Sequence, residues 1–313
     1  MSVPAPESMP IGKSSFQHAL ETARAAAGAQ HYPAGALYVV ATPIGNLADV
    51  TLRALHVLAT VDAIACEDTR HTQQLLRAVG IDRAGNELMA LHEHNEAEAA
   101  QAVITRLQAG QRVAYVSDAG TPAVSDPGAR LVAAVRAQGL RTIPLPGASS
   151  VTCALSAAGV TGDGGFVFTG FLPNKSGERG AAVQSLAKES RAVVLLEAPH
   201  RITALAEALS ALGVRPVTVA RELTKQFEQI ATLPCNQLPA WLAADPQRQR
   251  GEFALVLHPA DQETGADTDD RVLRLLLAEL PLKTAVKLAA EITGQPRNNL
   301  YQHALQLRDD AKG

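Results

Sequence analysis

Residues 37–66 read LYVVATPIGNLADVTLRALHVLATVDAIAC, and the pattern of this segment indicates the type of fold. Residues 37–41 and 63–66 are short apolar runs, whereas residues 52–59 carry apolar side chains at helical spacing. Apolar runs without alternation are typical of strands that are buried on both faces, as in a parallel sheet. The stretch therefore predicts a strand, a helix and a second strand, joined as one βαβ unit.

The same pattern continues along the chain. Further apolar runs begin at residues 89, 113 and 142, so the five strand starts lie 24 to 29 residues apart. Helical patterns separate these runs, at residues 73–79, 97–107 and 129–137. The spacing predicts an α/β domain over residues 35–158, with a five-stranded, largely parallel sheet.

A second α/β domain is predicted over residues 159–259. Its strand patterns cover residues 166–169, 192–196, 216–220, 227–233 and 253–258. The late strands follow one another with little helix between them, which predicts a mixed sheet rather than an all-parallel one.

The segments outside these two domains differ in composition. Residues 1–34 are rich in Pro, Ser, Ala and Gly, and despite a weak helical pattern over residues 16–27 we expect a flexible extension there. Residues 260–270 hold five acidic residues and no base, which is typical of a linker. Residues 271–313 contain three short helical patterns with seven bases and four acids, and they resemble a helix-turn-helix module.

Composition excludes several classes of protein. The chain has 313 residues, 47% of them hydrophobic, and a net charge of −3, so it lacks the overall basic surface of a sequence-blind nucleic-acid binder. Its longest apolar runs are far shorter than the ~20 residues of a membrane span. Cys66, Cys153 and Cys235 form no C-x-x-C pair. We therefore expect a reduced, cytoplasmic protein without a metal site.

Five polar loops follow the five predicted strands of the first sheet. They cover residues 42–46, 67–71, 92–95, 117–122 and 146–150. The carboxyl ends of parallel strands meet at one edge of a sheet, where ligands of open α/β folds bind. The loops contain neither G-x-G-x-x-G nor G-x-x-x-x-G-K-[ST], and His92 and His94 lack zinc-site spacing. They predict a binding cleft of another kind.

The loop sequences resemble a known family. In chain order they read ATPIGNL, CEDTRHT, LHEHNE, SDAGTPAVSDPG, PLPGASS, EAPHR and ARELTK. Together they are similar to the tetrapyrrole methylase superfamily, and the combination of EDTRHT, SDAGTP and RELTK resembles its ribosomal RNA small-subunit methyltransferase I branch. The resemblance runs from about residue 35 to residue 258 and continues into the C-terminal module.

The resemblance implies a cofactor, an acceptor and an assembly. S-adenosylmethionine would bind between the two α/β domains of a homodimer, and the acceptor would be the ribose 2′-hydroxyl of a cytidine in the decoding region of the small ribosomal subunit. The positions that carry over as cofactor contacts are Pro43, Ile44, Gly45, Ala119, Gly120, Thr121, Val124, Ser149, Ser150, Glu197 and Leu223.

The acceptor sets the catalytic requirement. A ribose hydroxyl is a very weak acid near neutral pH, so a carboxylate must take its proton or a cation must stabilise the alkoxide. Candidates at strand ends are Glu67, Asp68, Arg70, Glu93, Glu222 and Lys225. We favour Glu67 or Glu222 as the proton acceptor, with Lys225 and Arg70 as the polarising pair.

RNA contacts are expected from basic groups at the mouth of the cleft. These are Arg70, His71, Lys175, Arg179 and the bases of the C-terminal module. The alternative role of that module is a cap that stabilises the dimer.

Two other functions stay open. One is a methyltransferase of the same fold that acts on a tetrapyrrole or on a diphthine-type protein substrate. The other is a non-catalytic, S-adenosylmethionine-sensing RNA-binding regulator.

Overall fold

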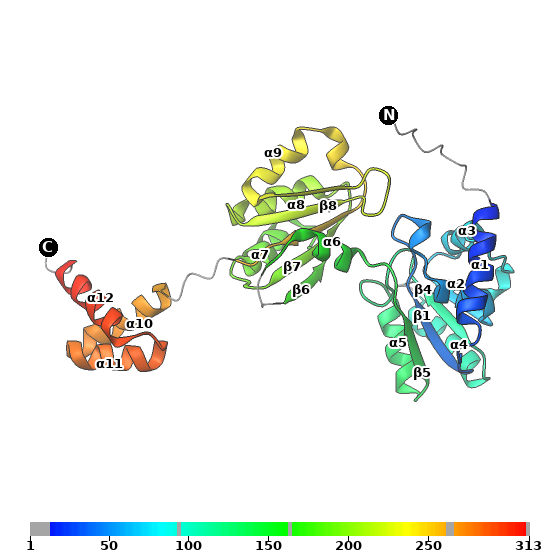
Figure 1. Ribbon diagram of the computed structural model, residues 1–313, viewed down its shortest axis with the longest axis horizontal. Coiled ribbons are helices and arrows are strands. Elements are labelled where there is room, and N and C mark those ends of the chain that lie inside the picture. The colour runs from blue at the N-terminus through cyan, green and yellow to red at the C-terminus, as the bar shows by residue number, and fades with distance from the viewer. Residues whose placement is uncertain (1–12, 93–94, 162–164, 261–265, 311–313) are drawn as a thin grey trace, which may run out of the picture.

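The chain forms two five-stranded sheets and a group of C-terminal helices (Figure 1). The computed structural model describes residues 13–92, 95–161, 165–260 and 266–310. None of the helices in these ranges is long and apolar enough to cross a membrane.

The first sheet contains the five strands expected from the apolar runs. They are β1 Ala36–Val40, β2 Ala63–Cys66, β3 Leu88–Ala90, β4 Val113–Val116 and β5 Arg141–Leu145. The strand order is β3-β2-β4-β1-β5, and every neighbouring pair is parallel. The predicted five-stranded parallel sheet is therefore confirmed.

Helices cover both faces of this sheet. The helices α1 Lys13–Ala27, α2 Leu52–Thr60 and α3 Thr69–Ala78 lie over one face, and α4 Glu96–Gln108 and α5 Gly128–Ala137 lie over the other. Successive strand residues belong to opposite cores: Leu37 packs with α4 and α5, whereas Tyr38 packs with α2. This burial on both faces explains why the strands lack polar alternation.

Helix α1 differs from the flexible extension expected over residues 1–34. It packs against α2, and its Ala23 and Ala27 are buried while Phe16 and Leu20 contact the first core. The composition suggested mobility because this helix has few large apolar residues; the apolar surface of α2 supplies the partner that stabilises it. Residues 1–12 of the expected extension lie outside the described residues.

The second sheet is mixed, as predicted. Its strands are β6 Phe166–Gly170, β7 Ala192–Glu197, β8 Pro216–Arg221, β9 Gln229–Pro234 and β10 Phe253–Leu257, in the order β6-β7-β10-β8-β9. The pair β6–β7 is parallel, and the other three pairs are antiparallel. The helix α6 Ser150–Ala158 covers one face, and α7 Ser176–Leu186, α8 Ile202–Leu209 and α9 Leu238–Ala243 cover the other.

The three C-terminal helices pack on one another around a small core of their own. They are α10 Ala266–Glu279, α11 Leu282–Thr293 and α12 Arg297–Asp310, drawn from orange to red in Figure 1. Helix α10 begins at Ala266, inside the predicted linker of residues 260–270, so the expected linker is too long at its C-terminal end. Residues 261–265 lie outside the described part of the chain.

Candidate active site

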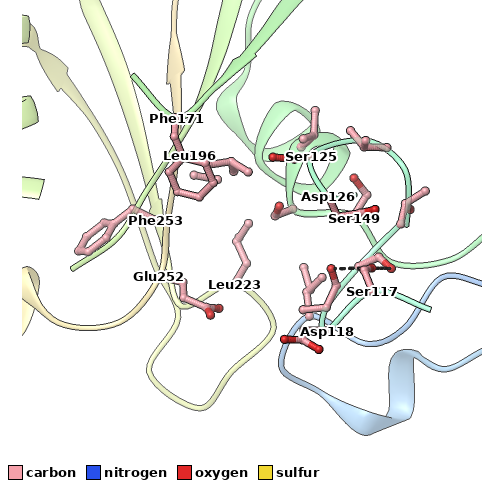
Figure 2. Close-up of a pocket in the computed structure, with 18 of the residues that line it drawn as sticks. Ser117, Asp118, Ser125, Asp126, Ser149, Phe171, Leu196, Leu223, Glu252 and Phe253 are labelled. Atoms are coloured by element: carbon pink, nitrogen blue, oxygen red, sulfur yellow. Dashed lines mark hydrogen bonds between the residues drawn. The ribbon is translucent and has the colours of Figure 1, made fainter. Parts of the chain in front are cut away.

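A cavity of about 420 Å³ lies between the two sheets (Figure 2). Loops at the carboxyl edge of the first sheet form one wall, and strands and loops of the second sheet form the other. The volume is within the ordinary range for sites that enclose a small organic ligand.

The wall from the first sheet is a set of interlocked loops. The N–H of Thr42 donates to the carbonyl of Gly120 at 2.9 Å, and the N–H of Gly120 returns a bond to the carbonyl of Thr42 at 3.1 Å. The Thr121 hydroxyl donates to the carbonyl of Ala148 at 2.9 Å. The loops that follow β1, β4 and β5 are therefore held together by hydrogen bonds.

Gly120 is required at the centre of these loops. Its φ of +84° lies in the left-handed region that favours glycine. A Cβ at this position would also lie 3.2 Å from Ile44 Cγ2, and both residues line the cavity.

Asp126 fixes the rest of the loop that follows β4. Its Oδ1 accepts hydrogen bonds from the Tyr115 hydroxyl at 2.9 Å and from the N–H of Gly128 at 2.8 Å. Its Oδ2 accepts a bond from the N–H of Ala123, a non-glycine residue with a φ of +65°. Burial and the neighbouring Asp126 carboxylate raise the pKa of Tyr115, so its hydroxyl keeps the proton that it donates.

The wall from the second sheet is mainly apolar. Its large side chains are Phe168, Phe171, Leu196 and Leu223. Figure 2 shows Phe171, Leu196 and Leu223 opposite the loop residues Ser125, Asp126 and Ser149, whereas the Phe253 ring points away from them into the core on the other face of the sheet. A planar or aliphatic part of a ligand would bury its surface against this wall.

Two buried carboxylate oxygens at the cavity have no hydrogen-bond partner among the described residues. Glu197 is 3% exposed; its Oε1 accepts a bond from the N–H of Ala198 and pairs with Arg201 Nε at 3.0 Å, while its Oε2 has no partner. Asp118 Oδ1 is in the same state. Buried acceptors without partners are costly, so this site fits a ligand that brings donors or positive charge.

S-adenosylmethionine meets this requirement. It carries an ammonium group, a sulfonium, two ribose hydroxyls and an adenine amino group, which complement the open oxygens of Glu197 and Asp118. Its adenine and methylene groups are suited to the apolar wall that includes Leu223. The residues present therefore fit the cofactor.

Glu67 follows β2 and also lines the cavity. Its Oε1 accepts a hydrogen bond from the N–H of Asp118 at 3.2 Å. Burial raises the pKa of Glu67, the negative charges of Asp126 and Asp118 raise it further, and the bond from Asp118 offsets only part of this. The Glu67 carboxylate is accordingly more basic than an exposed glutamate.

Glu222 and Lys225 lie outside the cavity lining and form an ion cluster with Glu252, which belongs to that lining. Lys225 Nζ lies 2.8 Å from Glu222 Oε1 and 3.0 Å from Glu252 Oε2, and the N–H of Glu252 donates to Glu222 Oε1 at 2.9 Å. Burial opposes ionisation of Glu222, but the bonds from Lys225 and Glu252 outweigh it and lower the pKa of Glu222. The Lys225 stem covers Gly45, where a Cβ would overlap it.

Most of the residues expected at the cofactor line the cavity. They are Ile44, Ala119, Gly120, Thr121, Val124, Ser149, Ser150, Glu197 and Leu223. Pro43 and Gly45 lie outside the lining set. Asp118 and Asp126 also line the cavity and were not expected there, although both belong to the SDAGTPAVSDPG motif; Phe253, which lies in a strand without any motif, was not expected either.

The expected RNA-binding residues have different surroundings. Arg70 and His71 are exposed at the start of α3, and Lys175 is exposed and pairs with Glu178 at 3.0 Å. The expectation for Arg179 is corrected: its side chain is buried, and its Nη1 donates to the carbonyl of Asn174 at 2.8 Å, which ties down the loop before α7.

The two remaining carboxylate candidates for the proton acceptor are Asp68 and Glu93, and neither is found at the cavity among the described residues. Asp68 caps α3, because its Oδ1 accepts the N–H of Arg70 at 2.7 Å and of His71 at 3.3 Å. Glu93 lies outside the described residues, as does His94 of the histidine pair weighed as a metal site.

Comparisons with known proteins agree with this architecture. Residues 36–239 match the Tetrapyrrole (Corrin/Porphyrin) Methylases family, and residues 262–308 match the RsmI C-terminal HTH domain. Among solved structures, diphthine synthase has a TM-score of 0.54 at 15% identity, covering 71% of this chain and 90% of that one. The methyltransferase CobJ has a TM-score of 0.53 at 20% identity, with coverages of 72% and 94%. These likenesses show the fold alone.

Curated relatives are much more similar in sequence. Ribosomal RNA small subunit methyltransferase I of Pseudomonas aeruginosa is 48% identical over 279 residues, which are 87% of this chain and 98% of that protein. The protein of the same name from Escherichia coli O157:H7 is 48% identical over 276 residues, 87% of this chain and 95% of that one. The chain therefore belongs to the tetrapyrrole methylase family, within its ribosomal RNA small subunit methyltransferase I group, and is an S-adenosylmethionine-dependent methyltransferase.

Proposed function

We propose that this methyltransferase methylates the ribose 2′-hydroxyl of a cytidine in the decoding region of small-subunit ribosomal RNA. The names of the curated relatives support ribosomal RNA as the substrate. The observation that carries the chemistry is the Glu67 carboxylate, which lines the cavity and has a raised pKa.

The residues that would hold the methyl donor are those of the two walls. The open oxygens of Asp118 and Glu197 accept its donor groups, and Leu223 and Ile44 contact its apolar surface. Bound S-adenosylmethionine supplies an electrophilic methyl group on a positively charged sulfur. The protein's part is then to align the acceptor and to exclude water, rather than to form a covalent bond.

Glu67 acts as the proton acceptor in this proposal. Glu67 would take the proton of the ribose hydroxyl as that oxygen becomes methylated; the bound cofactor would supply the methyl group from its sulfonium and be left as a neutral thioether. A carboxylate with a raised pKa is a better base for this step than an ordinary one. Glu222 is less suited, because its carboxylate already accepts bonds from Lys225 and Glu252 and its pKa is lowered.

Lys225 is assigned a positioning role. Its ammonium is shared between Glu222 and Glu252, while its stem lies on Gly45 of the loop after β1. This contact joins a loop of the first sheet to a loop of the second at the edge of the cavity. Arg70, His71 and Lys175 remain exposed and available to RNA phosphates.

Three further expectations belong to the same proposal. The chain would divide into two α/β domains, with α6 packed on the sheet of the second, and a C-terminal module that begins at α10. It would act as a homodimer, as the family resemblance implies. It would act in the cytoplasm, where its proposed substrate is assembled.

The test uses unmodified small ribosomal subunits and S-adenosylmethionine with a labelled methyl group. Alkali cuts RNA only beside a free 2′-hydroxyl, so a 2′-O-methylated cytidine stays in an uncut dinucleotide. We expect the label in one such dinucleotide that contains cytidine, and no label in subunits that are already methylated. Protein that binds S-adenosylmethionine yet leaves no label in RNA would reject the proposal.

A further inference from the structure

A second cavity, of about 490 Å³, adjoins the first. It is lined by Glu67, His92, Glu96, Ser125, Asp126, Pro127, Ala129 and Arg130. Glu67, Ser125 and Asp126 line both cavities. The proposed proton acceptor therefore stands in the wall that the two cavities share.

The lining of the second cavity combines inward carboxylates with an outward cation. The Glu96 side chain, in the first turn of α4, is 12% exposed, and its Oε2 lies 2.5 Å from Arg130 Nη1 on α5. The Arg130 side chain is 80% exposed. Its guanidinium has five N–H donors, so the bond to Glu96 leaves others for a further anion.

The carboxylates differ in what they still accept. Asp126 already accepts bonds from Tyr115, Gly128 and Ala123, so its role is to shape the loop. Glu67 accepts one backbone bond, and Glu96 accepts one from Arg130. Among the carboxylates of this cavity, Glu67 and Glu96 are therefore the two with free capacity to accept donors from a ligand.

We propose that the second cavity holds the acceptor nucleotide, with its 2′-hydroxyl at Glu67, the exocyclic amino group of its base at Glu96 and its phosphate at Arg130. This inference rests on the proposed function and adds the place and the selectivity of the acceptor site. A nucleotide matches the lining because it carries an amino donor on its base, a hydroxyl donor on its ribose and an anionic phosphate.

The charges of the lining explain why the second cavity would bind a nucleotide rather than a small anion. Free phosphate inside the cavity would meet the carboxylates of Glu67, Glu96 and Asp126, which repel it, whereas the phosphate of a nucleotide would lie on the exposed side of Arg130. A uracil base presents a carbonyl oxygen where cytosine presents its amino group, and that oxygen would face the Glu96 carboxylate. Acidic side chains accept hydrogen bonds from the cytosine amino group in nucleic-acid recognition generally.

The first experiment measures steady-state methylation of small subunits by the full chain. We expect Arg130→Ala and Glu96→Ala each to raise KM for the subunits by about tenfold, the scale of one charge-assisted bond. The Kd for S-adenosylmethionine should stay at its wild-type value. Arg136→Ala is the matched control, because Arg136 is exposed on the same helix and lies outside the lining of the cavity. An unchanged KM in both test variants would overturn the proposal.

The second experiment needs no methyl transfer. Cytidine 5′-monophosphate and uridine 5′-monophosphate are titrated into protein with labelled alanine methyl groups, and the NMR signal of Ala129 is followed. We expect the cytidine nucleotide to shift this signal, the uridine nucleotide to bind at least about fivefold more weakly, and Glu96→Ala to remove the preference.

The two experiments separate two kinds of failure. Absence of a shift at Ala129 with either nucleotide would overturn the acceptor site. Wild-type protein that binds the cytidine nucleotide at Ala129 but labels no small subunit would reject ribosomal RNA as the substrate and support the site itself.

Discussion

The two walls of the first cavity are built in different ways. The wall from the first sheet is made of loops whose backbone groups bond to one another, as Thr42 and Gly120 do. The wall from the second sheet is made of apolar side chains, such as Leu196 and Leu223, that lie on strands or beside them. The first wall therefore holds polar groups at fixed positions, and the second supplies apolar surface against which a ligand can pack.

This difference determines how each wall should fail when it is mutated. In the loop wall, one substitution changes the direction of hydrogen bonds and the charge at the reaction site. In the apolar wall, one substitution removes surface and leaves a void. The four predictions below test this contrast, beginning with the largest effect.

Glu67→Gln should have the largest effect, because it removes the proton acceptor and keeps the shape of the loop wall. We expect kcat to fall by about a hundredfold or more, the usual scale for a general base. The wild-type rate should rise with pH as Glu67 loses its proton, with its midpoint above the ~4.3 of an ordinary glutamate, because burial raises this pKa. The variant should lack that rise in a pH–rate profile.

Glu222→Gln is the control for this comparison. Its carboxylate belongs to the cluster with Lys225, so we expect a smaller loss of kcat and a pH profile that keeps the wild-type rise. Wild-type kcat in the Glu67→Gln variant would contradict the assignment.

Leu223→Ala tests the apolar wall. Leu223 is 9% exposed, and its truncation should lower the free energy of unfolding by ~2–3 kcal/mol and raise the Kd for S-adenosylmethionine about tenfold. Leu238→Ala removes an equally large side chain from the core on the other face of the same sheet. The control should lose similar stability in a denaturant titration and keep its Kd, and an equal rise in Kd for both would refute the wall's role.

Gly120→Ala tests the backbone of the loop wall. The positive φ and the approach of Ile44 predict a loss of ~1 kcal/mol or more in unfolding free energy, together with weaker S-adenosylmethionine binding. Gly139→Ala is matched, since its φ is +69° and nothing lies within 4 Å of the added carbon. Calorimetric titration should show a raised Kd for S-adenosylmethionine in Gly120→Ala only. Equal Kd values in the two variants would show that the backbone of Gly120 does not determine cofactor binding.

Tyr115→Phe should give the smallest effect. It removes the buried hydrogen bond to Asp126, which predicts a loss of ~1 kcal/mol in the free energy of unfolding. Tyr38→Phe removes a similar bond to the carbonyl of Pro33, on the opposite face of the sheet from Tyr115. Both should melt earlier, but only Tyr115→Phe should weaken S-adenosylmethionine binding, by about threefold. A matching change in the control would argue against Asp126 as the organiser of the loop.

The contrast between the walls also explains what could be predicted from sequence. The loop wall was predictable, because short polar loops after parallel strands gather at one edge of the sheet, and Gly120 and Thr121 stood in a recognisable motif. The position of Phe253 at the cavity could not be predicted, because a strand residue in a buried apolar run does not indicate which face of the sheet it lies on or which residues it contacts.

Two other residues show the limits of local patterns. Arg179 has the charge of an RNA contact, but its fold position lets it donate to backbone carbonyls, and sequence alone does not contain that geometry. Helix α1 has a weak pattern of its own, and the contact that stabilises it lies on α2, some thirty residues along the chain.

The oxygens of Asp118 and Glu197 that lack a partner among the described residues have a practical consequence. A molecule that donates to them and binds only the folded protein stabilises it by an amount that grows with the logarithm of its concentration relative to Kd. Cofactor affinity can then be read from a melting temperature: at a hundredfold excess over Kd, linkage adds ~2.7 kcal/mol to folding. A dye-based thermal shift assay could therefore rank cofactor analogues and inhibitors without any RNA substrate.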